Sequence, residues 1–258
     1  MVIDFAQSIS GFVVGGIVGL TGVGGGSLMT PLLVLLFGIH PATAVGTDLL
    51  YAAITKSGGT VVHARKGHVD WRIVRLLASG SLPAAAITLF TVHQFAPGGL
   101  GGASKTITFA LGIALLLTAI SLLFRNQIRS FSTSHDPDAV HHPVYTVITG
   151  AVLGCLVSLS SVGAGALGVT ALFFLYPRLP AIRIVGSDLA HAVPLTLVAG
   201  IGHWMLGSVN WQLLASLLVG SLPGIYIGSH LSSHVPEKVL RPLLALMLIL
   251  VGTKLIVF

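Results

Sequence analysis

The two halves of the chain are copies of one another. The segment GFVVGGIVGLTGVGGGSL at 11–28 matches GAVLGCLVSLSSVGAGAL at 150–167, a shift of 139 residues. Further along, VGTDLLYA at 45–52 matches VGSDLAHA at 185–192, a shift of 140 residues. Glycines, tryptophans and prolines that follow in the two halves align with the same shift. A duplication of this length predicts two structural units of one design, so the same series of elements must fit into the fold twice.

Both copies are too apolar for a water-soluble domain. Hydrophobic residues make up 54% of the chain and charged residues only 8%, whereas a typical soluble domain has about 25% charged residues. Runs such as 108–124 and 243–258 reach or approach the ~20 residues that cross a bilayer as a helix. We therefore expect an all-α polytopic membrane protein.

Each half divides into five apolar segments. The first repeat, 1–124, contains segments near 5–21, 26–39, 43–63, 71–92 and 105–124. The second repeat, 143–258, contains segments near 144–159, 165–177, 183–204, 211–230 and 239–257. The polar stretch between them, RNQIRSFSTSHDPDAVHH at 125–142, is interpreted as a linker.

Lysine and arginine collect in particular loops, and this predicts the orientation of the chain. They follow the third segment, begin the linker, and precede the third and fifth segments of the second half. Because basic loops stay in the cytoplasm, the linker 125–142 is expected there and both termini outside. Equivalent segments of the two halves then run in opposite directions, which is the inverted repeat of many secondary transporters.

Glycine interrupts both halves at the same place. The first two segments of each half are short, and TGVGGG at 21–26 and SSVGAG at 160–165 join them. A glycine turn before a helix start offers free N–H groups and the positive end of a helix dipole, which suits a small anion. We predict a substrate site from the following residues: Gly22, Gly24, Gly25, Gly26 and Ser27, with Ser161, Gly163 and Gly165. Whether these short segments span fully or are re-entrant stays open. The alternative for the preceding glycines, Gly11, Gly15 and Gly19, is a helix-packing seam.

Charged residues within the apolar segments are candidates for function. Asp48 and Asp188 either carry a coupling proton or, following Thr47 and Ser187, cap helix starts. Lys56 either binds the anion or extends its ammonium group to the membrane interface.

Three histidines are further candidates for proton coupling. His63 and His203 close the third segments of the two halves, and His191 follows Asp188 by three residues. Histidine titrates near physiological pH, although interface histidines without such a role are commoner.

Other chemistry has no support in the sequence. Cys155 is the single cysteine, and there is no HExxH motif, cysteine pair or carboxylate cluster, so no metal, cofactor or catalytic residue is expected. The net charge of +6 is explained by basic cytoplasmic loops, and nucleic acid is not an expected partner.

The motifs resemble a known family. Three features are similar to the TauE/SafE family, also called DUF81 or toluenesulfonate-uptake proteins. They are GLTGVGGGSLMTPLL at 19–33, the paired VGTDL and VGSDL, and the GSLP in the fourth segment of each half. The resemblance covers nearly the whole chain, but the second half has SVGAGAL for GVGGGSL and Thr170 for Pro31. The resemblance implies secondary transport of sulfite, sulfoacetate or other organosulfonates across the bacterial inner membrane, and the name of the family points to export.

The predicted function is thus a proton-coupled secondary transporter of small sulfur-containing anions that works by alternating access. Its expected partners are the anion, protons and the lipid bilayer, with a homodimer among the oligomeric states left open. Alternatives are an uncoupled channel or uniporter of the same fold, or a carrier of a different small anion. An intramembrane enzyme using Ser27 and His191 is disfavoured, because catalytic constellations rarely have a matching copy.

Overall fold

The computed structural model describes residues 5–21, 26–95, 104–135, 143–231 and 237–257. These residues form α-helices joined by turns, which confirms the predicted all-α fold. The helices of the first half are α1 (Phe5–Thr21), α2 (Gly26–Phe37), α3 (Pro41–Arg65), α4 (Trp71–Phe95) and α6 (Ser104–His135). Those of the second half are α7 (Pro143–Ser160), α8 (Ala166–Leu175), α9 (Ala181–Met205), α10 (Trp211–Leu231) and α11 (Glu237–Val257).

Among the described helices, four are long and apolar enough to cross a membrane: α4, residues 107–124 of α6, α7 and α9. α2 and α8 are short, with 12 and 10 residues, as the sequence predicts. α7 differs from the expectation, because its 18 residues suffice for a span.

The helix α6 also continues further than expected. It runs to His135 through the first part of the predicted linker. That part, 125–135, contains neither glycine nor proline, and Pro137 is the first residue that cannot continue a helix.

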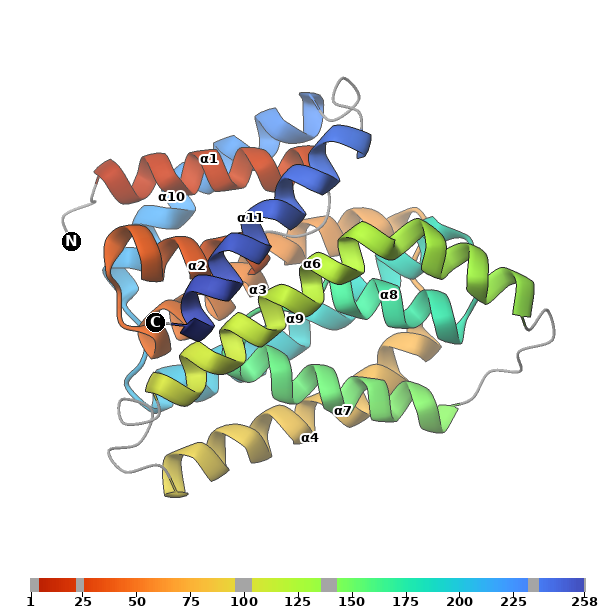
Figure 1. The fold of residues 1–258 in the computed structure, drawn as a ribbon, viewed down its shortest axis with the longest axis horizontal. Helices are drawn as coiled ribbons and strands as arrows, with labels where there is room; N and C mark the ends of the chain where they lie inside the picture. Colours follow the sequence, from red (N-terminus) through yellow and green to blue (C-terminus); the bar gives the residue numbers. More distant parts are fainter. Residues whose placement is uncertain (1–4, 22–25, 96–103, 136–142, 232–236, 258) are drawn as a thin grey trace.

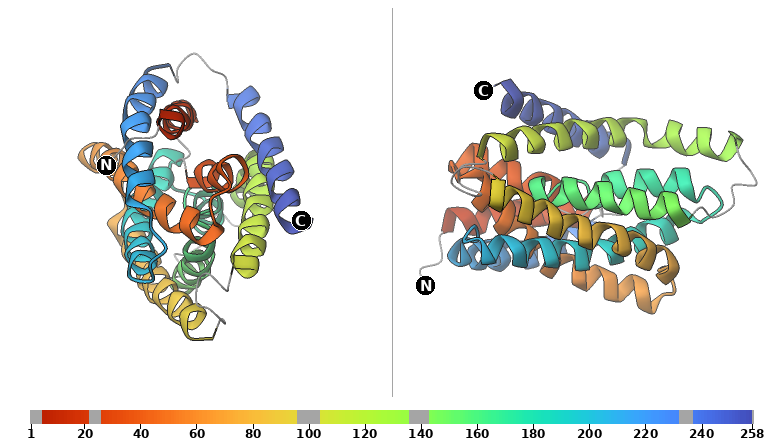
Figure 2. Two further views of the ribbon diagram at one scale, coloured as in Figure 1. Left: turned by 90° about the vertical axis from the view of Figure 1, so that its left-hand side faces the viewer. Right: turned by 90° about the horizontal axis from the view of Figure 1, so that it is seen from below.

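The helices of one half pack mainly against those of the other. α1 lies along α10 and α4 lies along α7, with α2, α3, α8 and α9 between these pairs (Figure 1). α6 and α11 lie side by side along one face (Figure 2). In repeat terms, the first helix of each half packs on the fourth helix of the other.

Small residues make these pairings close. A Cβ atom at Gly11 or Gly15 would overlap the backbone of α10, and one at the equivalent Gly150 or Gly154 would overlap the backbone of α4. Gly80 and Gly220 face Val147 and Ser8 in the same way. The packing-seam interpretation is therefore correct for Gly11 and Gly15.

The contacts between α3 and α9 are reciprocal. Gly46, near the start of α3, contacts His203 near the end of α9, and the equivalent Gly186 contacts His63. The two helices are therefore antiparallel. Residues that exchange partners in this way are typical of copies related by a two-fold axis.

A pair of equivalent hydrogen bonds joins the ends of these helices to the opposite half. The backbone N–H of Asp70 donates to Ser187 Oγ (2.8 Å), and that of Asn210 donates to Thr47 Oγ1 (3.1 Å). Asp70 and Asn210 also cap α4 and α10 through their side-chain oxygens.

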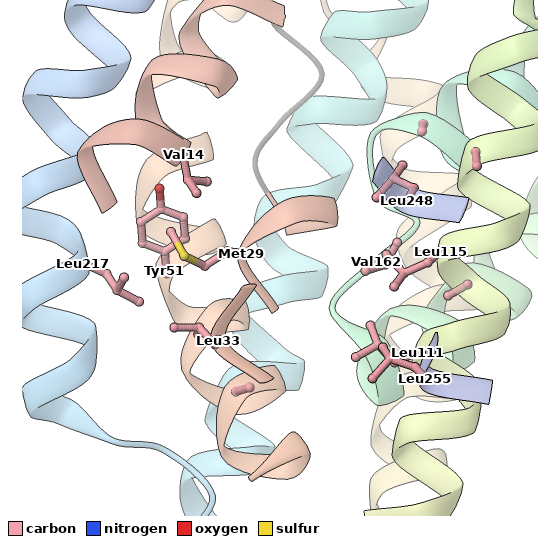
Figure 3. Packing of buried hydrophobic residues seen from close by; sticks show 14 of the residues in the cluster. Val14, Met29, Leu33, Tyr51, Leu111, Leu115, Val162, Leu217, Leu248 and Leu255 are labelled. Atoms are coloured by element: carbon pink, nitrogen blue, oxygen red, sulfur yellow. The ribbon is translucent and has the colours of Figure 1, made fainter. Parts of the chain in front are cut away.

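Apolar side chains enclose the first half of α3. Tyr51 lies beside Met29, with Val14, Leu33 and Leu217 around them, and a second group contains Val162 beside Leu115, with Leu248, Leu111 and Leu255 near them (Figure 3). Residues 44–53 of α3 are all buried. Polar side chains on this stretch are therefore shielded from water.

We predict that Gly80→Ala and Gly220→Ala each lower the thermal midpoint of the detergent-solubilised protein. Forcing a methyl group against the facing carbonyl oxygen costs about 1–3 kcal/mol. The matched control is Gly58→Ala, because a Cβ at this helical position meets nothing within 4 Å. Equal midpoints for all three variants would contradict the close packing of these pairs.

Candidate functional site

The site lies where the chain breaks between α7 and α8. α7 ends at Ser160, and the next residues take left-handed backbone conformations: Ser161 (φ 57°), Gly163 (φ 122°) and Gly165 (φ 125°). A positive φ is uncommon outside glycine, so Ser161 marks an over-determined turn. This break contains three of the predicted substrate-binding residues.

The break leaves backbone donors at the start of α8. Among the hydrogen bonds of the described residues, none uses the N–H of Gly163, Ala164 or Gly165. These groups stand at the positive end of the α8 dipole, where an anion is stabilised.

Lys56 reaches this break from the other half. Its side chain is 5% exposed, and Nζ donates to the carbonyl oxygen of Ala164 at 3.0 Å. The ammonium group therefore points into the protein, and the alternative in which it extends to the membrane interface is wrong.

Asp48 lies on the same helix and is fully buried. Thr30 Oγ1 donates to Asp48 Oδ2 at 2.5 Å. Among the described residues, Asp48 Oδ1 accepts no hydrogen bond of ordinary geometry, and the buried hydroxyl of Ser161 faces this carboxylate and interacts with it. Because α3 begins at Pro41, Asp48 is inside the helix, and its interpretation as a cap is wrong.

The second half contributes Asp188 and His191 from α9. Asp188 is also inside its helix rather than a cap, and its carboxylate fills the space that a Cβ at Gly168 of α8 would take. His191 Nε2 is 2.8 Å from Ser81 Oγ of α4, and its Nδ1 is buried without a partner. The Lys56 ammonium interacts electrostatically with Asp188, with Asp48 and with His191.

The other two histidines contact different groups. His203 is buried, and its Nε2 is 2.9 Å from the carbonyl oxygen of Ser158 in α7. The ring of His63 packs on the edge of His68, 5.8 Å between centroids. Their predicted role in proton coupling stays a prediction.

The first-half counterpart of this break falls largely outside the described residues. Gly22, Gly24 and Gly25 lie there, while Gly26 and Ser27 form the first turn of α2. Within the described residues, no group of three histidine, cysteine or acidic side chains gathers as a metal site.

Sequence reasoning missed three contributors: Thr30, Ser81 and the Ala164 carbonyl. Ser81 had a signal, because it recurs as Ser221 in the GSLP motif, where the counterpart of His191 is Tyr51. The other two depend on how helices pack: Thr30 reaches Asp48 from the preceding helix, and the Ala164 carbonyl reaches Lys56 from the other half.

Comparison with known proteins gives a consistent result. Residues 8–255 match the family model described as Sulfite exporter TauE/SafE. The chain is 40% identical to the probable membrane transporter protein YjnA of Bacillus subtilis, over 96% of this chain and 98% of that protein. It is 29% identical to a probable membrane transporter protein of Xylella fastidiosa (strain Temecula1), over 83% and 79% of the two chains. No solved structure matches the chain.

We predict that Thr30→Val destabilises the protein, because it leaves the buried Asp48 carboxylate without its donor. A hydrogen bond to a charged group contributes about 1.5–3 kcal/mol, and Thr30→Ser should retain it. Thr196→Val is the matched control, since the buried Thr196 hydroxyl donates only to carbonyls of its own helix. Thermal midpoints in detergent measure the difference, and an equal loss for Thr30→Val and Thr196→Val would contradict the role given to Thr30.

Proposed function

Because the chain belongs to the TauE/SafE sulfite exporter family, we propose that it is a secondary transporter of small sulfur-containing anions. The substrate class is sulfite, sulfoacetate or another organosulfonate, and the family description points to export. The two halves form inverted repeats in the bacterial inner membrane and move against each other around a central site. The linker 125–142 is cytoplasmic and both termini are outside.

One observation carries this proposal: a buried lysine of one half meets the broken helix of the other. Lys56 brings a positive charge to the start of α8, where the backbone N–H groups have no acceptor among the described residues. A sulfur oxyanion offers several oxygens that accept hydrogen bonds from such donors.

Unpaired buried polar atoms support the same location. In the described part of the chain, His191 Nδ1 is buried without a partner, and Asp48 Oδ1 and Ser161 Oγ face each other without a hydrogen bond of ordinary geometry. Buried polar atoms are nearly always hydrogen-bonded, so unsatisfied atoms on Asp48, on Ser161 beside it and on His191 support a place that a polar ligand fills.

Protons are the proposed coupling ion. Asp48 and Asp188 are the first candidates for the carrier, since both face Lys56 at a place shielded from water. His191, His63 and His203 are further candidates. An uncoupled channel or uniporter with the same site is the alternative that flux measurements exclude or establish.

The test is uptake of sulfite and of a small sulfonate by proteoliposomes. We expect saturable uptake that Lys56→Gln reduces at least about tenfold in kcat/KM, because the variant removes a buried positive charge that attracts the anion. Lys66→Gln is the control, since Lys66 is exposed in the turn after α3 and should keep wild-type uptake. Unchanged kinetics for Lys56→Gln would contradict the site, and absence of any sulfur-anion flux would contradict the substrate class.

A further inference from the structure

The buried site holds more negative than positive charge. Asp48 and Asp188 are 0% and 1% exposed, Lys56 is 5% exposed, and the ammonium interacts with both carboxylates. When all three groups are ionised, two negative charges and one positive charge leave a net charge of −1. A second negative charge brought to this place by an anion is therefore opposed unless a proton comes with it.

Few other titratable groups face Asp48. Its own helix contributes Lys56 and Tyr51, and Asp188 and His191 of α9 interact with Lys56 rather than with Asp48 itself. α2, the break at 160–165 and residues 107–124 of α6 contain no titratable side chain. Tyr145 and Cys155 of α7 and Tyr226 of α10 are exposed. The charge of the site therefore depends on these five side chains.

The hydrogen bonds distinguish the two oxygens of Asp48. Oδ2 already accepts the hydroxyl proton of Thr30. Oδ1 accepts no hydrogen bond of ordinary geometry among the described residues, and the Ser161 hydroxyl faces the carboxylate. A proton on Oδ1 turns this oxygen from an acceptor into a donor, and Ser161 Oγ or an oxygen of the bound anion can accept its hydrogen bond.

We propose, on the basis of the proposed function, that the site takes up a monovalent anion together with one proton, which Asp48 carries on Oδ1. The anion binds between Lys56 and the start of α8. Its negative charge and the added proton cancel, so the site keeps the same charge whether empty or loaded. Transport is therefore electroneutral anion–proton symport, and the direction of net flux follows the two concentration gradients.

The first experiment uses methanesulfonate, which stays a monoanion at every working pH, so that pH acts only on the protein. With the membrane potential clamped at zero, a pH lower outside by one unit should accumulate the sulfonate about tenfold. An inside-negative potential of about 60 mV without a pH gradient should leave its distribution unchanged, whereas it excludes an uncoupled anion about tenfold.

The variant experiment locates the proton. Asp48→Asn should allow downhill flux but lose the accumulation driven by pH. Asp70→Asn is the matched control and should keep it, because Asn210 already fills the equivalent position and caps α10 in the same way. Should Asp48→Asn fail to fold, the wild type alone tests the coupling through a pH-sensitive dye inside the vesicles, which should record one proton entering per sulfonate.

Three results would each overturn a different part of the proposal. Downhill sulfonate flux that responds to potential and moves no proton overturns the symport while leaving the proposed function intact. Accumulation that survives Asp48→Asn but is lost in Asp188→Asn overturns the assignment to Asp48. Absence of methanesulfonate and sulfite flux under every condition overturns the proposed function itself.

Discussion

A lysine and two aspartates buried beside a broken helix are the constraint on which the rest of this structure depends. Removing each such ion from water costs several kcal/mol after relaxation, and only hydrogen bonds and opposite charges nearby offset that cost. The Ala164 carbonyl supplies one partner for Lys56, and the Thr30 hydroxyl supplies one for Asp48. The first contact joins the two halves and the second joins α2 to α3 within the first half, so the charged cluster depends on packing both between and within the halves.

The scaffold is reciprocal, but the chemistry placed on it is not. Thr47 with Asn210 and Ser187 with Asp70 form the same hydrogen bond with the halves exchanged. By contrast, Lys56 has Thr196 as its counterpart, and His191 has Tyr51. The two equivalent hydrogen bonds, one at the start of α3 and one at the start of α9, suit a carrier that opens alternately on two sides. A lysine without a counterpart in the other half suits a single anion site per chain.

Much of the fold follows from the sequence, because apolar segment length and glycine position are local signals. The duplication, the ten segments and the short α2 and α8 could be predicted for this reason. The extension of α6 to His135 was missed because polar composition was taken as a sign of a linker, although residues 125–135 contain no helix breaker. The sequence could not predict which way the Lys56 ammonium points, because this depends on the Ala164 carbonyl that lies opposite it. It also could not predict whether Asp48 caps a helix, because this depends on where α3 begins.

The most direct measurement is anomalous diffraction from crystals grown with a small bromine-labelled sulfonate. The account predicts one bromine peak per chain near the α7–α8 break, with the sulfonate oxygens between Lys56 Nζ and the N–H groups of residues 163–165. A sulfonate bound only at the exposed basic loops, or a well-ordered break with no sulfonate at saturating concentration, would contradict it.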